Sequence, residues 1–333
     1  MRTKIFILLI LLQLIIVLAL LFNILYKNQS VLVSINEISP KTIDFPYSST
    51  FKYYYEPRPN SIQTIDPKLV VELGYPAGTQ IRYKINADGL NQIPNYTATK
   101  SAGVYRIVTL GDSFTFGQNV NTEDNYPSQL EKKLNSSLKC TNIKKFEVIN
   151  LGVYGYDIAY SVERYKLRGQ KYNPDLILWF IINTDWTRLD ELQIPKTASF
   201  DAQLQASGEE AKLEKQGIFY KGWEEAQQQI LQTLGGERNI LRLQKKYLES
   251  VNDYYKGPLI LFNFPSQDVN SLNIINGFVK DRQHTYFYGN LANIYQNQKY
   301  YLGDSHPSSQ GYTLIVNDLY NYLTQNNIIP CQK

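Results

Sequence analysis

The sequence has few residues of the kinds that bind metals or carry out redox chemistry. Among 333 residues there are two histidines, two cysteines and one methionine. No carboxylate–histidine spacing of the zinc-protease type occurs, and no glycine-rich phosphate-binding loop. These absences argue against a metal enzyme, and we expect neither a metal site nor a cofactor. They also leave only His284 and His306 for any reaction that needs an imidazole.

The sequence also lacks a large excess of charge of one sign. The net charge is +4, and the basic residues are interspersed with acidic ones. Nucleic-acid-binding domains usually carry a basic stripe, so we expect no nucleic-acid partner. Hydrophobic residues make up 43% of the chain, which is enough to bury a core. The length is long for one domain and short for two.

An apolar run covers residues 5–26. At about 1.5 Å per residue, a helix of this length crosses a hydrocarbon core roughly 30 Å thick. The run ends without the small residues of a signal cleavage site, which favours an uncleaved anchor over a cleaved signal. Arg2 and Lys4 favour a cytoplasmic N-terminus. Residues 1–27 are therefore predicted to be a cytoplasmic stub and a transmembrane helix, with the rest of the chain extracytoplasmic.

The two cysteines, Cys140 and Cys331, are far apart in the sequence and show no metal-ligand spacing. In an oxidising compartment outside the cytoplasm they can pair as a disulfide. Two unrelated thiols are the alternative, and the residues alone leave both possibilities open.

Residues 28–103 are rich in Pro, Asn, Thr and Tyr. They are interpreted as a linker followed by a small, irregular, partly β extension, with short β-like runs at 69–73 and 80–85. The tyrosines at 53–55 and 300–301 can present faces that stack on a carbohydrate. A compositional bias of the source organism explains these tyrosine clusters equally well.

From residue 104 onward, β-rich runs alternate with segments of helical spacing. This alternation predicts a parallel sheet with helices on both faces, a three-layer α/β domain over residues 104–333. The first expected helix has Pro127 in its first turn. The expected strands are 105–110, 147–151, 175–182, 258–264 and 285–288.

A polar insert at about residues 186–255 separates the third and fourth expected strands, and it is rich in Gln, Glu and Lys. Its helical stretches, such as 222–234, form either a lid over the site or a solvated decoration, and the sequence leaves both open. Trp186, at the start of the insert, either lines a substrate pocket or supports the insert.

Polar segments follow the ends of the expected strands. Ligands of a parallel sheet bind beyond the carboxyl ends of its strands, so these segments should converge on one edge. They are residues 111–113, 152–155, 183–185 and 303–307.

Ser113, His306 and Asp304 supply the parts of a nucleophilic site at this edge. A serine hydroxyl is a poor nucleophile unless a base takes its proton. His306 is the candidate base, and Asp304 can orient its imidazole and stabilise the charged form. Each motif alone is weak evidence, and their shared position at strand ends strengthens the joint interpretation. His284 begins an expected strand away from this edge and is predicted to be structural.

These four segments, with the strands before them, resemble the four sequence blocks of the SGNH (GDSL-type) hydrolase superfamily, and the resemblance runs from about Arg106 to the C-terminus. It implies a three-layer flavodoxin-like parallel sheet of order 2-1-3-4-5, and ester hydrolysis or acyl transfer. It also implies that the backbone N–H groups of Ser113 and Gly155 bind the oxyanion. The first, second and closing blocks correspond to residues 107–117, 148–156 and 304–312.

The third family block usually reads Gly-x-Asn-Asp, with the Asn side chain in the oxyanion hole. Here residues 182–185 place Thr184 at that position. Either Asn183 reaches the site through a shifted turn or Thr184 donates from its hydroxyl, and a carboxamide N–H favours Asn183. In the closing block one residue, not the more common two, separates Asp304 from His306.

The fold implied by the resemblance also bears on the cysteines. In the order 2-1-3-4-5 the first and last helices lie side by side on one face and run away from the active edge. Cys140 follows the first helix and Cys331 the last. The implied fold therefore predicts a disulfide between them.

Three hypotheses of function follow. The leading one is an extracytoplasmic serine esterase that hydrolyses an O-acyl ester, foremost an O-acetyl ester, of a small molecule or glycan through an acyl-enzyme on Ser113. The second is an O-acyltransferase acting on an envelope glycan with the same residues. The third is a non-catalytic binding or scaffold protein on a decayed hydrolase fold. The sequence does not indicate an oligomeric state.

Overall fold

The computed structural model describes residues 48–215, 220–265 and 268–332. Its central sheet consists of β3 (Val104–Leu110), β4 (Lys145–Asn150), β5 (Leu176–Phe180), β6 (Leu259–Phe262) and β7 (Thr285–Tyr288). All pairings are parallel, and the spatial order is β4-β3-β5-β6-β7. Counted along the sheet domain this is the flavodoxin-like order 2-1-3-4-5, so the predicted α/β fold and strand order are confirmed.

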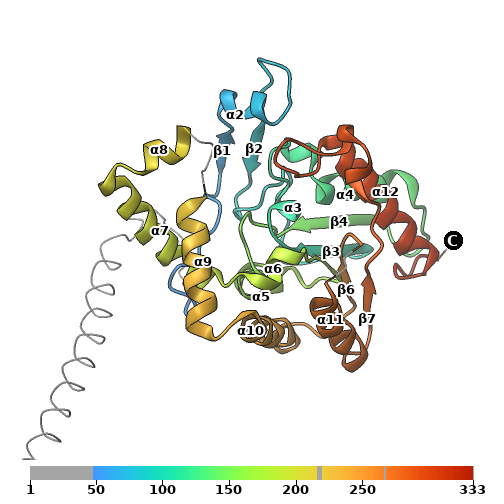
Figure 1. Ribbon diagram of the computed structural model, residues 1–333. Coiled ribbons are helices and arrows are strands. Elements are labelled where there is room, and N and C mark those ends of the chain that lie inside the picture. Colours follow the sequence, from blue (N-terminus) through green and yellow to red (C-terminus); the bar gives the residue numbers. More distant parts are fainter. Residues whose placement is uncertain (1–47, 216–219, 266–267, 333) are drawn as a thin grey trace, which may run out of the picture.

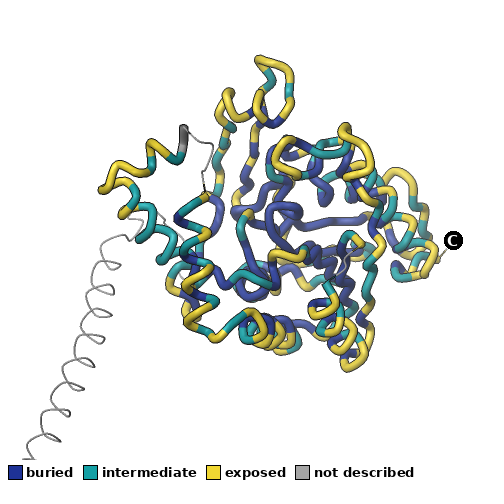
Figure 2. Tube along the Cα trace, viewed as in Figure 1, coloured by how far each residue is buried: buried dark blue, intermediate teal, exposed yellow. Residues whose placement is uncertain are grey.

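Helices cover both faces of the sheet (Figure 1). One face packs on α4 (Tyr126–Ser137) and α12 (Ser309–Gln325), and the other on α5 (Ile158–Arg164), α10 (Glu237–Ser250) and α11 (Val269–Asp281). Neighbouring strand residues point to opposite faces, so Ile107 belongs to the first cluster and Val108 to the second. The strands β5 and β6 consist only of apolar residues, because both of their faces are buried (Figure 2).

One secondary-structure prediction for the extension that precedes the sheet is wrong. The β-like run at 69–73 lies mostly in α2 (Pro67–Glu72). Asp66 caps this helix by accepting a backbone N–H of the first turn at 2.7 Å, and a proline occupies the first turn. The second run forms β2 (Arg82–Ile85), which pairs antiparallel with β1 (Ser61–Thr64). Local capping therefore overrode the β propensity of 69–73.

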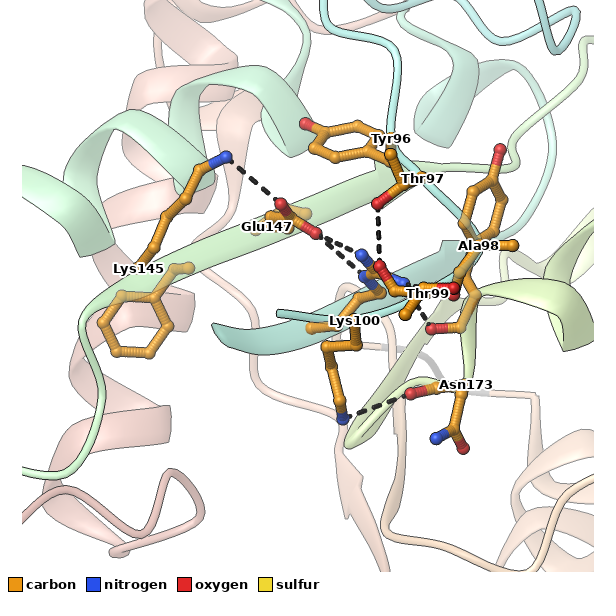
Figure 3. Close-up of polar contacts among 12 residues, drawn as sticks. Tyr96, Thr97, Ala98, Thr99, Lys100, Lys145, Glu147 and Asn173 are labelled. Carbon is orange, nitrogen blue, oxygen red and sulfur yellow. Dashed lines mark hydrogen bonds and ion pairs between the residues drawn. The ribbon is translucent and has the colours of Figure 1, made fainter. Parts of the chain in front are cut away.

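The end of the extension is fastened to the edge of the sheet where β3 and β4 begin (Figure 3). Buried Arg106 donates to Glu147 at 2.7 and 2.9 Å and to the carbonyl of Ala98 at 3.3 Å. Lys100 donates to the carbonyl of Asn173 at 3.3 Å. These contacts hold the extension against the sheet.

Helices fill the segment between β5 and β6. They are α6 (Asn183–Thr187), α7 (Asp190–Ser207), α8 (Glu210–Lys215), α9 (Lys221–Leu234) and α10. α7 packs on α9, while α10 lies against α5 and α6. In Figure 1, α7, α8 and α9 stand to one side of the sheet.

A disulfide joins Cys140 to Cys331, whose Cα atoms lie 5.1 Å apart. Cys140 follows α4 and Cys331 follows α12, two helices that pack on each other. The pairing is the one that the implied fold predicts.

The membrane helix predicted at residues 5–26 lies outside the described residues. Within the described ranges, no helix combines the length and the apolar character needed to cross a membrane.

Candidate active site

Ser113 stands where the chain leaves the sheet. After β3, Gly111 turns the backbone with φ 141°, and a Cβ there would lie 2.6 Å from a carbonyl oxygen of β5. Asp112 then caps the short helix α3 (Ser113–Phe116), accepting a backbone N–H of its first turn at 2.9 Å. Ser113 is the first residue of α3, at the carboxyl edge of the sheet.

Ser113, His306 and Asp304 form one hydrogen-bonded chain. Nε2 of His306 lies 2.8 Å from Oγ of Ser113, and Nδ1 lies 2.8 Å from Oδ2 of Asp304. With its proton on Nδ1, the imidazole donates to the carboxylate and leaves Nε2 free to accept the serine proton. The ring of Phe114 packs 5.0 Å from the imidazole, centre to centre.

Asn119 completes the surroundings of Asp304, although no sequence motif marks it. Its Nδ2 donates to Oδ2 of Asp304 at 2.5 Å. Its backbone N–H and carbonyl bind the hydroxyls of Tyr83 and Tyr75 from the extension, at 2.8 and 2.9 Å. The only local signal is that Asn tolerates a left-handed backbone, which Asn119 adopts with φ 66°.

The carboxylate of Asp304 is held in its charged form. Burial alone would raise its pKa, but the hydrogen bonds and charge of His306 outweigh burial and lower the pKa below its ordinary value. A charged carboxylate here stabilises the imidazolium that forms when His306 takes a proton.

Gly155 lies in a tight turn after β4. The N–H of Tyr156 donates to the carbonyl of Val153 at 3.3 Å, and Gly155 has φ 80°. A side chain has no room here, because a Cβ on Gly155 would lie 2.6 Å from the hydroxyl oxygen of Tyr55. The turn therefore requires glycine both for its backbone conformation and for this close approach.

Asn183 and Thr184 begin α6, and both are exposed on the wall of a pocket of about 300 Å³. The structure thus places both candidates for the third oxyanion donor on one surface. Phe114 lines the pocket and also packs on His306, so the pocket borders the triad. The other lining residues, none of them charged, are Ile182, Asn263, Phe264, Pro265, Asn293 and Tyr295.

Trp186 is fully buried in the apolar cluster between the sheet and α10, which also contains Leu241 and Leu248. It has no exposed surface to offer a substrate. The interpretation of Trp186 as a substrate-binding residue is therefore corrected, because its indole packs the insert against the sheet.

Four buried carboxylates, one of them that of Asp112 next to Ser113, gather around one guanidinium. Asp112, Asp157, Asp185 and Asp190 are each at most 5% exposed, and all four interact with the charge of Arg188. Burial outweighs the attraction of Arg188 and raises the pKa of all four, with Asp185 and Asp190 well above the ordinary value.

His284 is exposed and lies just before β7, at the ends of the strands opposite to Ser113. Its carbonyl accepts the N–H of Leu259 at 3.0 Å, so its backbone extends the pairing of β6 with β7. The imidazole of the site is therefore that of His306.

No protein-family model matches the chain, and no curated protein matches its sequence. Among solved structures, the chain is similar to the psychrotrophic esterase EstA from Pseudoalteromonas sp. (14% identity over 66% of this chain and 97% of that chain, TM-score 0.40). It is also similar to a Clostridium thermocellum family 3 carbohydrate esterase (16%, 67% and 96%, TM-score 0.35). A third is a two-domain esterase active on acetylated mannans (13%, 67% and 50%, TM-score 0.41). These similarities concern the fold.

Proposed function

We propose that this protein is a serine hydrolase of carboxylic esters, with Ser113 as nucleophile, His306 as general base and Asp304 as the residue that orients it. The supporting observation is the unbroken chain of two 2.8 Å contacts from Ser113 Oγ through the imidazole to the Asp304 carboxylate. This chain lies at the carboxyl edge of a parallel sheet, where ligands of such sheets bind. It matches the geometry that activates a serine for acyl transfer.

The first half of the reaction transfers the acyl group to the enzyme. Oγ of Ser113 attacks the ester carbonyl carbon while Nε2 of His306 takes the hydroxyl proton. The carbonyl oxygen becomes an oxyanion, for which the N–H groups of Ser113 and Gly155 and a side chain of α6 are the proposed donors. The bond from the carbonyl carbon to the alcohol oxygen then breaks, and His306 gives its proton to the departing alcohol.

The second half releases the acid and restores the enzyme. Water attacks the acyl carbon and gives a proton to His306, and the bond to Ser113 breaks as Oγ takes that proton back. Asp304 stays charged throughout, consistent with its lowered pKa.

We propose a small neutral acyl group, foremost acetyl, as the part transferred. The pocket beside the triad is only about 300 Å³ and is lined by aliphatic, aromatic, amide and hydroxyl side chains without a formal charge. This lining suits an O-acetylated neutral molecule better than a charged acyl group.

We also propose that the reaction takes place outside the cytoplasm, with the chain anchored by residues 5–26. The apolar run supports the anchor. The Cys140–Cys331 disulfide supports an oxidising compartment. Two free thiols in the protein isolated from its own cells would contradict this location.

Ser113→Ala tests the proposal most directly. The variant should lose turnover of p-nitrophenyl acetate by on the order of 10⁵-fold or more, because the nucleophile is gone. Its thermal unfolding should match that of the parent chain, and a fluorophosphonate probe should label the parent but not the variant.

Ser137→Ala is the matched control, since Ser137 is an exposed serine at the end of α4 and should keep full activity. Turnover that survives Ser113→Ala, or a probe that labels another residue, would reject Ser113 as the nucleophile. An unreactive parent chain would favour the non-catalytic hypothesis.

A further inference from the structure

The orientation of the peptide that joins Tyr154 to Gly155 determines where the Gly155 N–H points. A trans peptide is planar, so its carbonyl and its N–H point in opposite directions. If the Gly155 N–H is to bind an oxyanion, the Tyr154 carbonyl must point away from the substrate. The direction of this one carbonyl therefore determines whether the donor is available.

The turn can hold this peptide in two ways. Tyr154 and Gly155 are its central residues, closed by the Tyr156 to Val153 hydrogen bond at 3.3 Å. Gly155 has φ 80° and Tyr154 is not among the residues with positive φ, as in a type II turn. Types I and II differ by a half-rotation of the central peptide. Glycine is compatible with both, so the residue type alone does not choose between them.

Tyr55, 99 residues earlier in the chain, contacts this peptide directly. Its hydroxyl donates to the carbonyl oxygen of Tyr154 at 2.7 Å. Burial, reinforced by the charge of Asp190, raises the pKa of Tyr55 well above its ordinary value, so the hydroxyl keeps its proton to donate. A flipped peptide would lose this hydrogen bond. Its N–H would then donate to the hydroxyl oxygen and point away from the oxyanion.

The tyrosine itself is held from several sides. Its ring packs on those of Tyr156 and Tyr160, at 5.2 and 6.1 Å between centres, and its carbonyl accepts the hydroxyl of Tyr156. Three and two residues earlier, Lys52 and Tyr53 donate backbone N–H groups to Glu191 of α7, at 2.8 and 3.1 Å. Tyr55 is thus a fixed support for the peptide.

We propose that Tyr55 is a positioning residue that locks the Tyr154–Gly155 peptide with its N–H toward the oxyanion. This inference rests on the proposed function. If Tyr55 has this role, the extension helps to build the site. The insert also contributes, because its Glu191 binds the backbone just before Tyr55. Tyr55 acts through Gly155 and does not itself take part in proton transfer.

Tyr55→Phe in the full-length chain removes the hydroxyl and keeps the ring contacts. With p-nitrophenyl acetate, kcat and kcat/KM should fall together by roughly tenfold, the pattern of an interaction made only in the transition state. Inhibition by an alkylboronic acid, whose tetrahedral adduct places an oxygen in the oxyanion hole, should weaken by about the same factor. Thermal unfolding should show that the variant is folded.

Tyr96→Phe is the matched control, because it removes a buried hydroxyl of the extension that donates to Glu131 at 2.5 Å and not to the turn. It should leave kcat and boronate inhibition within about twofold of the parent chain. If the parent chain is active and folded Tyr55→Phe keeps the same kcat, the positioning role of Tyr55 is rejected and the proposed function is not affected. A raised KM at constant kcat would instead make Tyr55 a substrate contact and also overturn the lock. A parent chain without esterase activity would reject both.

Discussion

Ser305 accounts for the short spacing between the aspartate and the histidine. It has a left-handed backbone, with φ 70°. This fold-back lets Asp304 accept from the imidazole at 2.8 Å and from the backbone N–H of His306 at 3.2 Å. One intervening residue therefore suffices to close the triad. The same carboxylate also accepts from Asn119, so three donors share its two oxygens.

Asn119→Gly should lower kcat by about tenfold with KM nearly unchanged, because Asp304 loses one charge-assisted hydrogen bond. Glycine is the appropriate replacement, since it tolerates the φ of 66° at this position. Steady-state kinetics on p-nitrophenyl acetate measure the split between kcat and KM.

Asn119→Asp distinguishes positioning from simple packing. It keeps the shape but sets a second carboxylate against Asp304, so its loss of activity should be larger at about pH 8 than at about pH 6. A loss of activity that is equal at both pH values would contradict the positioning role of Asn119. Equal activity of the parent chain, Asn119→Gly and Asn119→Asp would contradict it as well.

At the scale of elements, α4 and α12 pack side by side and are joined beyond their ends. The Cys140–Cys331 disulfide closes a loop of 191 residues. Backbone hydrogen bonds flank it, including Thr141 N–H to the carbonyl of Gln332 at 2.7 Å. The C-terminal tail is thereby fixed to the segment between α4 and β4.

Replacing both cysteines with serine should lower the free energy of unfolding by about 2–4 kcal/mol, because the unfolded chain regains the entropy of the open loop. Urea unfolding of the double variant and the parent chain measures this difference. Catalysis should be unchanged, since the disulfide follows helices that run away from the active edge. Thiol counting on denatured, unreduced protein is the control, and two titratable thiols would show that the bond is absent.

At the scale of the whole molecule, one buried cluster contains more acidic than basic side chains. Four carboxylates surround Arg188, and burial raises the pKa of each. An acid whose pKa is raised on folding binds more protons in the folded state than in the unfolded one. Its contribution to stability is complete below the unfolded-state pKa of about 3.9 and is lost as pH rises through the folded pKa. Asp304, with a lowered pKa, acts in the opposite direction, but only at pH values below about 4.

The protein should therefore be more stable at about pH 5 than at about pH 8, measured by the urea midpoint of unfolding. Asp185→Asn should reduce this difference, since it removes one titrating group and keeps an oxygen for the N–H of Ile182, now at 3.0 Å. Asp281→Asn, at an exposed site, should leave the difference unchanged. A midpoint that is equal or higher at about pH 8 would contradict the prediction.

Much of the fold could be predicted because its signals are local. Apolar runs mark the strands, and Pro127 marks the start of a helix, so the α/β class and the strand order followed from periodicity and from the family resemblance. The prediction was wrong at 69–73, where the Asp66 cap competes with a β-like run. It also left two roles open for Trp186, since an indole beside a site has the same sequence signature whether it faces the pocket or the core.

The sequence by itself determined the parts that depend on neighbouring residues: the Gly-Asp-Ser turn, the strand ends and the single histidine available at the active edge. The tertiary structure alone decided what supports them. Asn119 binds an aspartate 185 residues away, and Tyr55 binds a carbonyl 99 residues away. No sequence periodicity or motif indicates either contact, because each depends on where separate segments lie once the core has packed. The candidate catalytic residues are therefore visible in the sequence, whereas the long-range contacts around them are visible only in the tertiary structure.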